Sequence, residues 1–248
     1  MFYLCAMKVA EQIREKIKTI PKSEPFGYAD LDIAPADFFT AAKAIERLQK
    51  KGEIKKISKG MFYVPEISIF GPMPPKYDLI LKKYLFENGK RVGYITGGEL
   101  YNSLNLTTQN YFKSKISTKR NRKKIEISWL KTNSVKAYVD VTEENYQLLG
   151  ILDALKDIKK IADTTANTAL KILMPKIKVF LKKDIVDLLK FALEYPPRTR
   201  ALLGAIIENM FPSEFNLEPI KKSLNPSSTY KIRINENDFP NIKNWNIQ

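Results

Sequence analysis

Residues 37–65, DFFTAAKAIERLQKKGEIKKISKGMFYVP, join a helical pattern to a pattern of two short strands. The apolar residues of the first half recur at the spacing of one helical face and predict a helix over 37–51. These residues are Ala41, Ala44, Ile45 and Leu48. Gly52 follows where a helix needs a carboxyl-terminal cap, a position that glycine occupies without strain.

The second half of this stretch predicts a tight hairpin. Strands are expected over 54–57 and 61–64, joined by a turn at Ser58-Lys59-Gly60. A helical pattern over 7–20 and a short, turn-rich segment that fits a small second helix precede the stretch. Three helices followed by a hairpin is the element order of a winged helix-turn-helix, so we expect such a DNA-binding domain over 1–66.

One face of the 37–51 helix is basic, because its cations fall opposite the apolar stripe and Thr40 lies near them at the amino end. In a winged helix the third helix enters the major groove and the wing lies against the DNA backbone. The residues predicted to contact DNA are Thr40, Lys43, Arg47, Lys50, Lys56 and Lys59. The alternative is a face that is only solvated, as most basic helix faces are.

The remaining chain changes to a mixed and then a helical pattern. Residues 67–75, ISIFGPMPP, have the Pro and Gly content of a linker, and a second domain is expected over 76–248. A capping box is expected at Thr96-Gly97-Gly98-Glu99. The fold class is therefore α+β, with a winged helix-turn-helix followed by a mixed α/β and helical domain. The further expected elements are helices at 77–85, 143–160, 164–174, 176–194 and 197–211, with a break at Pro175, and strands at 91–95, 124–130, 135–141 and 229–234.

The charge of the chain is strongly positive and unevenly distributed. Forty-two Lys and Arg against 27 Asp and Glu give a net charge of +15, and residues 76–140 hold 14 of the basic and only five of the acidic side chains. A polyanionic partner is favoured, and nucleic acid is the commonest. Beside Tyr111 and Phe112 lies a basic cluster that fits nucleic acid or an acidic protein equally well. Its members are Lys113, Lys115, Lys119, Arg120, Arg122, Lys123 and Lys124.

Residue types that are missing restrict the chemistry. The chain has no histidine and one cysteine, which excludes His-dependent catalysis and metal binding, internal disulfides and zinc–cysteine clusters. No phosphate-binding or dinucleotide-binding glycine motif occurs, and Asp157-x-Lys159 and Glu53-x-Lys55 lie outside nuclease-like strand patterns. We therefore expect no catalytic residue, cofactor or metal. No apolar run of about 20 residues and no signal peptide is evident, so a cytoplasmic protein without membrane contact is expected.

Three blocks of sequence carry a resemblance to a known family. LQKKGEIKKISKGMFYVPE (48–66), YITGGELYNSLNLTTQN (94–110) and YPPRTRALLGAIIE (195–208) resemble the AbiEi-like antitoxins of type IV toxin–antitoxin systems, over about residues 8–210. The resemblance implies a winged helix that represses the antitoxin's own operon by binding double-stranded DNA, an operator that we expect to contain inverted repeats. It also implies a carboxyl-terminal domain that counters a neighbouring nucleotidyltransferase-like toxin without a necessary stable complex. The antitoxin would not be an enzyme.

Two other functions stay open from the sequence. The basic middle region would suit a nucleic-acid-processing enzyme or accessory factor. A plain transcriptional repressor without a toxin partner would use the same winged helix.

Overall fold

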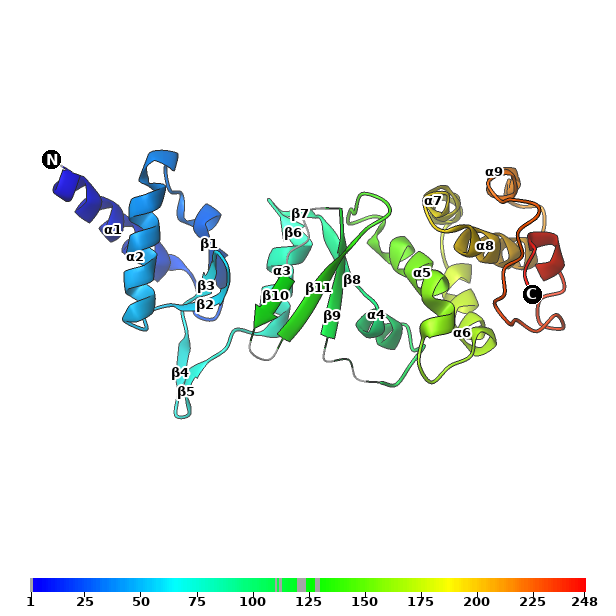
Figure 1. Cartoon of the computed structure of the whole chain (residues 1–248), viewed down its shortest axis with the longest axis horizontal. Coiled ribbons are helices and arrows are strands. Elements are labelled where there is room, and N and C mark those ends of the chain that lie inside the picture. The colour runs from blue at the N-terminus through cyan, green and yellow to red at the C-terminus, as the bar shows by residue number, and fades with distance from the viewer. Residues whose placement is uncertain (1, 110, 112, 120–123, 128–129) are drawn as a thin grey trace. The chain divides into compact units, whose positions relative to one another are not determined.

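The structure, a computed structural model, describes residues 2–109, 111, 113–119, 124–127 and 130–248 (Figure 1). Helices and several small sheets make it a mixed α/β structure, which fits the expected α+β class. The chain divides into two compact units, the first made of residues 1–87 with 125–129 and the second of 88–124 with 130–248. Each unit has a hydrophobic core of its own.

The first unit alternates helices with the strands of one sheet. Strand β3 lies between β1 and β2 in an antiparallel order β1-β3-β2, with Phe26 opposite Phe62. Its elements to this point are α1 (Phe2–Thr19), β1 (Pro25–Gly27), two 3-10 helices (Tyr28–Leu31 and Pro35–Asp37), α2 (Phe38–Lys50), β2 (Lys55–Ser58) and β3 (Met61–Tyr63). The helix expected over 37–51 and the hairpin expected at 54–64 are thus present within one or two residues.

Burial on one side of each element forms the core of the first unit. The apolar stripe of α1 packs with the predicted stripe of α2 and with Phe26, Ile54 and Phe62 of the sheet region. The small second helix expected before α2 is instead β1 followed by a 3-10 turn. The Asp30 carboxylate accepts a hydrogen bond from the Gly27 N–H at 2.7 Å, which tightens the chain at this point.

The expected linker at 67–75 is instead an ordered hairpin, made of β4 (Glu66–Ser68) and β5 (Gly71–Met73). The following helix, α3 (Tyr77–Leu85), belongs to the first unit, so the division of the chain lies after residue 87 rather than at 67–75. Lys83 Nζ lies 2.9 Å from Asp30 Oδ1 and the Tyr84 hydroxyl 3.0 Å from the Ser58 hydroxyl. These contacts fasten α3 to the region of the first sheet.

The next strands are divided between the two units. β6 (Phe86–Glu87) and residues 125–127 of β10 (Lys124–Ile127) are assigned to the first unit. The second unit has β7 (Lys90–Arg91), β8 (Gly93–Thr96), α4 (Gly98–Ser103), β9 (Lys113–Thr118) and β11 (Leu130–Lys136). The strand order is β10-β11-β9-β8, with β11 parallel to β9 and β8 antiparallel to it. The strand expected over 135–141 therefore starts earlier and ends at Lys136.

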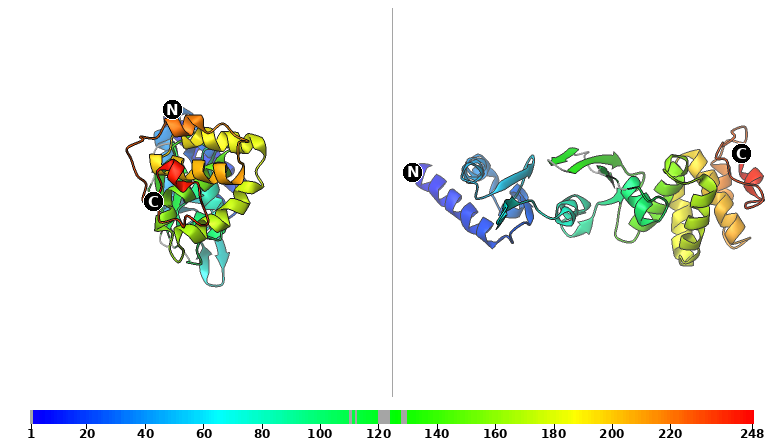
Figure 2. Two further views of the ribbon diagram at one scale, coloured as in Figure 1. Left: turned by 90° about the vertical axis from the view of Figure 1, so that its right-hand side faces the viewer. Right: turned by 90° about the horizontal axis from the view of Figure 1, so that it is seen from below.

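Helices complete the second unit, and Figures 1 and 2 show them packed as one group. They are α5 (Tyr146–Asp157), a 3-10 turn (Ile158–Lys160), α6 (Ala166–Lys178), α7 (Lys182–Ala192), α8 (Pro197–Met210), α9 (Glu218–Lys222) and a 3-10 turn (Ile242–Trp245). The break expected at Pro175 is absent, because α6 continues through it. Leu173 and Ile177 are fully buried on either side, and this packing offsets the hydrogen bond that proline removes.

The strand expected over 229–234 is reduced to one bridge, between Tyr230 and Ile247. The chain instead folds back onto α8. A Cβ on Gly204 would lie 2.1 Å from the ring of Trp245, so only glycine admits the ring at this place. Trp245 Nε1 donates to Glu208 at 2.8 Å, and Asn241 Nδ2 donates to the same carboxylate oxygen at 2.9 Å.

Candidate nucleic-acid interface

The exposed face of α2 holds the first group of predicted contacts. Lys43 and Arg47 are exposed, and Thr40 is half-buried in the first turn of the helix. The opposite face is buried as expected, with Ala41 and Ile45 almost fully out of solvent. Lys43 and Arg47 therefore point away from the core with no salt bridge to another described residue, and are free to meet an external anion.

Lys50 differs from these two cations because it is already paired. Its Nζ lies 2.9 Å from Glu46 Oε1, one helical turn earlier. The hydrogen bond and charge of Lys50 lower the pKa of Glu46, and Arg47 and Lys43 lower it further. Glu46 therefore stays ionised on this face, so Lys50 would have to exchange or share its partner to bind a phosphate.

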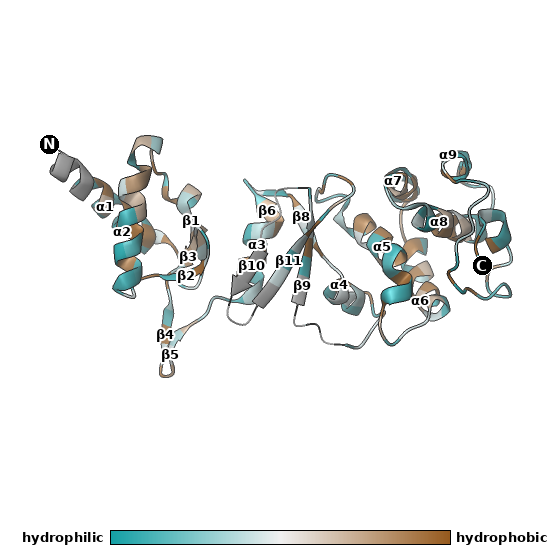
Figure 3. Ribbon diagram, in the orientation of Figure 1, coloured by the Kyte–Doolittle hydropathy of each residue, from teal (hydrophilic) through white to brown (hydrophobic). Residues whose placement is uncertain are grey.

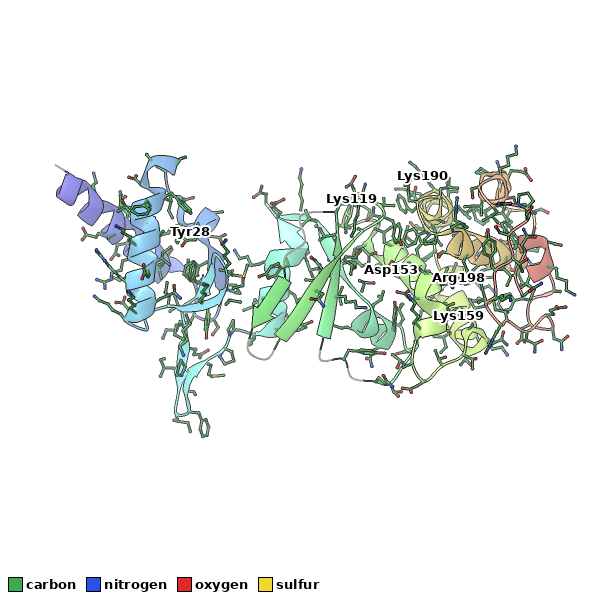
Figure 4. All side chains as sticks on the ribbon, in the orientation of Figure 1. Tyr28, Lys119, Asp153, Lys159, Lys190 and Arg198 are labelled. Carbon is green, nitrogen blue, oxygen red and sulfur yellow. The ribbon has the colours of Figure 1, made fainter. Side chains whose placement is uncertain are left out.

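Aromatic side chains next to the basic face were missed by the sequence analysis. Phe39 is 71% exposed, and Lys43 Nζ lies 4.6 Å from the centroid of its ring. Phe38 is half exposed and packs at 5.0 Å, between ring centroids, against Tyr28, which Figure 4 labels. The sequence signal was two adjacent phenylalanines at the start of the helix and outside its apolar stripe. An exposed ring here can contact a thymine methyl group or a sugar.

The hairpin β2–β3 holds the second group. Lys56 and Lys59 are exposed, while Ile57 and Phe62 are buried beneath them. The turn needs Gly60, whose φ is 76°, and a bulge between Lys56 and Ser58 bends the strand there. Burial raises the pKa of Tyr84, and its bond to Ser58 partly opposes this rise. The neutral Tyr84 hydroxyl thus stabilises the base of the hairpin through its hydrogen bond with Ser58.

The basic cluster predicted at 113–124 is only partly described. Lys115 is exposed in β9, and Lys119 Nζ lies 3.4 Å from Asp140 Oδ2 (Figure 4). Lys113 and Lys124 lie in β9 and β10, and nothing is described of their side chains. Arg120, Arg122 and Lys123 lie outside the described residues. The described members belong to the second unit, whereas α2 and its hairpin belong to the first.

A buried polar network lies in the second unit, centred on Asp153, which Figure 4 labels. Asp153 is 1% exposed and accepts from the Tyr94 hydroxyl at 2.8 Å and the Thr96 hydroxyl at 2.6 Å. Lys156 Nζ lies 2.6 Å from its other oxygen. Burial, followed by the charge of Asp153, raises the pKa of Tyr94 and of Tyr195. We call Tyr94, Thr96, Asp153, Lys156 and Tyr195 the Asp153 network.

The expected capping box at 96–99 is wrong. The Thr96 hydroxyl is engaged by Asp153, and the helix cap is Gly97, with φ of 74° and no side-chain cap bond. A Cβ on Gly98 would lie 2.1 Å from the Tyr111 ring, so this second glycine gives room for an aromatic contact. The pair of glycines therefore serves backbone shape and packing.

Two of the three sequence blocks singled out above, 94–110 and 195–208, make hydrogen bonds to α5. From the 94–110 block, Tyr94 and Thr96 bond Asp153, and the Tyr101 hydroxyl donates to Asp157 at 2.8 Å. From the 195–208 block, the Arg198 guanidinium donates to the Lys156 carbonyl at 3.1 Å. Holding these two segments against α5 is thus a sufficient structural role for these side chains.

The described residues contain no group of three or more His, Cys, Asp or Glu side chains placed to hold a metal ion. None of their helices is both long and apolar enough to cross a bilayer.

Comparisons with known proteins do not assign the chain to a family. No family model matches the chain, and no curated protein matches it. Among solved structures, the RV2827C protein from Mycobacterium tuberculosis is similar at 9% sequence identity and a TM-score of 0.47. The alignment covers 91% of this chain and 85% of that one.

Proposed function

We propose that the first unit is a winged helix-turn-helix that binds double-stranded DNA through α2 and the β2–β3 hairpin. The observation that carries this proposal is the exposed pair Lys43 and Arg47 on a helix whose other face is buried. The element order supports it, since β1 pairs with β3 and the β2–β3 hairpin directly follows α2. In this arrangement Thr40 and Phe39 would meet base edges or sugars, and Lys56 and Lys59 would meet phosphates.

We infer the biological role from the resemblance of the three sequence blocks. The chain would be a DNA-binding antitoxin that represses its own type IV operon and counters a nucleotidyltransferase-like toxin. The second unit would carry the antitoxin activity, and the chain itself would not be an enzyme. The partners would be an operator with inverted repeats and the toxin, in a functional relation rather than a stable complex.

The first experiment is fluorescence anisotropy with the DNA upstream of the protein's own gene and a scrambled duplex of equal length. We expect preference for the native sequence to persist near physiological salt. Lys43→Ala/Arg47→Ala should weaken binding to the native duplex. Lys22→Ala/Lys82→Ala removes the same charge from exposed positions of the first unit outside α2 and the hairpin, and should leave that binding unchanged.

Equal binding to both duplexes that disappears steeply with salt would contradict the proposal, because phosphate attraction alone behaves in this way. The antitoxin role has its own test, which is growth rescue when the chain is co-expressed with the neighbouring nucleotidyltransferase-like gene. Specific DNA binding without rescue would leave a plain repressor. Divalent-metal-dependent cleavage of DNA or RNA would favour the processing enzyme instead.

A further inference from the structure

The β4–β5 hairpin exposes an apolar tip of unusual extent. Phe70 is 94% exposed and Ile69 is 93% exposed, and Ile67 and Met73 are also exposed. Figure 3 shows this tip in the hydrophobic colour. Clustered exposed apolar side chains of this kind mark an interaction surface, because the transfer of their apolar surface out of water is favourable.

The hairpin is held in one shape before any partner binds. The Ser68 hydroxyl donates to the Gly71 carbonyl at 3.0 Å and accepts from the Phe70 N–H at 3.1 Å. Ile67 lies opposite Pro72, and Gly71 has φ of 100°, which favours glycine. The side chains of Ile69 and Phe70 are thus presented by a fixed turn, so little backbone ordering is lost on binding.

Charge selects protein over nucleic acid as the partner of this tip. Residues 64–75 contain one acidic residue, Glu66, and no Lys or Arg, in a chain of net charge +15. A hairpin without cations gains no counterion release on DNA, and Glu66 is repelled by phosphates. A basic protein surface attracts the same hairpin.

The second unit has an apolar pocket that fits such a tip. Its volume is about 310 Å³, and Lys190, labelled in Figure 4, is among its lining residues. Lys190 forms no salt bridge within the described part of the chain. The apolar lining is Val186, Leu189, Leu193, Phe215, Pro219 and Ile220.

We propose that the β4–β5 hairpin of one copy docks in this pocket of a second copy. Phe70 and Ile69 would enter the apolar lining, and Glu66 would face Lys190. A twofold axis makes this contact twice, once in each direction. This dimer does not depend on DNA binding.

The test is sedimentation velocity on the full chain from about 1 to 100 µM, with circular dichroism to verify folding. We expect the dimer fraction to rise with concentration. Phe70→Asp and Val186→Asp, both at exposed positions, should each raise the dimer dissociation constant by about 30-fold or more. Val179→Asp changes another exposed valine, which does not line the pocket, and should have no effect.

A mixture of the Phe70→Asp and Val186→Asp chains should form mixed dimers, because one intact tip then meets one intact pocket. Glu66→Lys and Lys190→Glu should each weaken the dimer, and the two together should restore it. A chain that stays monomeric at 100 µM overturns the proposal, as does a dimer insensitive to both Asp variants. If the chain is a monomer and Phe70→Asp lowers its DNA affinity, the hairpin contacts DNA. That result would also overturn the proposal.

Discussion

Replacing Asp153 by Asn tests the buried charge pair at the centre of the second unit. The substitution keeps the shape of the side chain, and its remaining oxygen can still accept from Tyr94 and Thr96. Its amide nitrogen then replaces the oxygen that lies 2.6 Å from Lys156 Nζ. Two donors face each other, and the ammonium group loses its counter-charge.

The size of the effect follows from burial. The side chain of Lys156 is 22% exposed, and that of Asp153 is 2% exposed. Leaving one member of a buried pair without its partner costs about 3–5 kcal/mol. Some water reaches Lys156, so we expect the lower end, about 3 kcal/mol. For a domain of this size each kcal/mol lowers Tm by about 2–4 °C, which gives a fall of about 6–12 °C.

Differential scanning calorimetry of the full chain measures this fall. Asp140→Asn is the matched control, because it removes the partner of Lys119 at a site where the Asp140 side chain is 82% exposed. An exposed pair contributes less than about 1 kcal/mol, so the control should move Tm little. Adding Lys156→Met to Asp153→Asn removes the orphaned ammonium and should recover part of the stability. Equal shifts for Asp153→Asn and Asp140→Asn, or no recovery, would refute the reasoning.

Three other predictions concern DNA binding, the carboxyl-terminal segment and pH. If Lys43, Arg47, Lys56 and Lys59 each contact a phosphate, DNA affinity should fall about 150-fold between 50 and 200 mM salt. For Lys43→Ala/Arg47→Ala, with two contacts left, the fall measured by an anisotropy titration should be only about 12-fold. An unchanged salt slope would exclude both residues as phosphate contacts. Gly204→Ala usually stabilises a helix, but here the new methyl group meets Trp245, so we expect unfolding free energy to fall and Trp245 fluorescence to shift to the red, read in a Trp129→Phe background. A stabilised variant would contradict the contact. Because burial raises the pKa of Tyr195 above the value near 10 of an unfolded chain, its contribution to stability is complete below pH 10 and is lost as pH rises further. Absorbance at 295 nm should therefore show buried tyrosines such as Tyr195 ionising only as the circular dichroism signal is lost. Ionisation of all tyrosines in a fully folded chain would contradict this prediction.

Local patterns explain what could be predicted from the sequence. The stripe of α2, its basic face and the β2–β3 hairpin depend on spacing within about 30 residues, and all three appear in the structure. Thr96 illustrates the limit of such reasoning. Its hydroxyl could cap the next helix by sequence, but it bonds to Asp153, 57 positions away. Only the tertiary fold decides between a backbone N–H donor nearby and a carboxylate acceptor far along the chain.

Composition misled at 67–75 for a related reason. Proline and glycine in ISIFGPMPP have the frequency of a linker, yet the register of Ile67 with Pro72 closes a hairpin. Pairing of strands is not visible in composition. Phe39 was missed because an aromatic residue beside an apolar stripe is normally assigned to the core, and only its 71% exposure sets it apart.

The return of the chain onto α8 has a consequence for synthesis. The amides of Ile232 and Arg233 donate to the Gln248 carbonyl at 2.6 and 2.9 Å, and Trp245 fills the space above Gly204. The core of the second unit therefore needs the segment around Trp245, whereas α1, α2, α3 and the first sheet come from the first 87 residues. At about 5–20 residues per second, about 10–30 s separate the two on the ribosome. A chain that stops before Trp245 would carry the proposed DNA-binding elements joined to an open, protease-sensitive second unit.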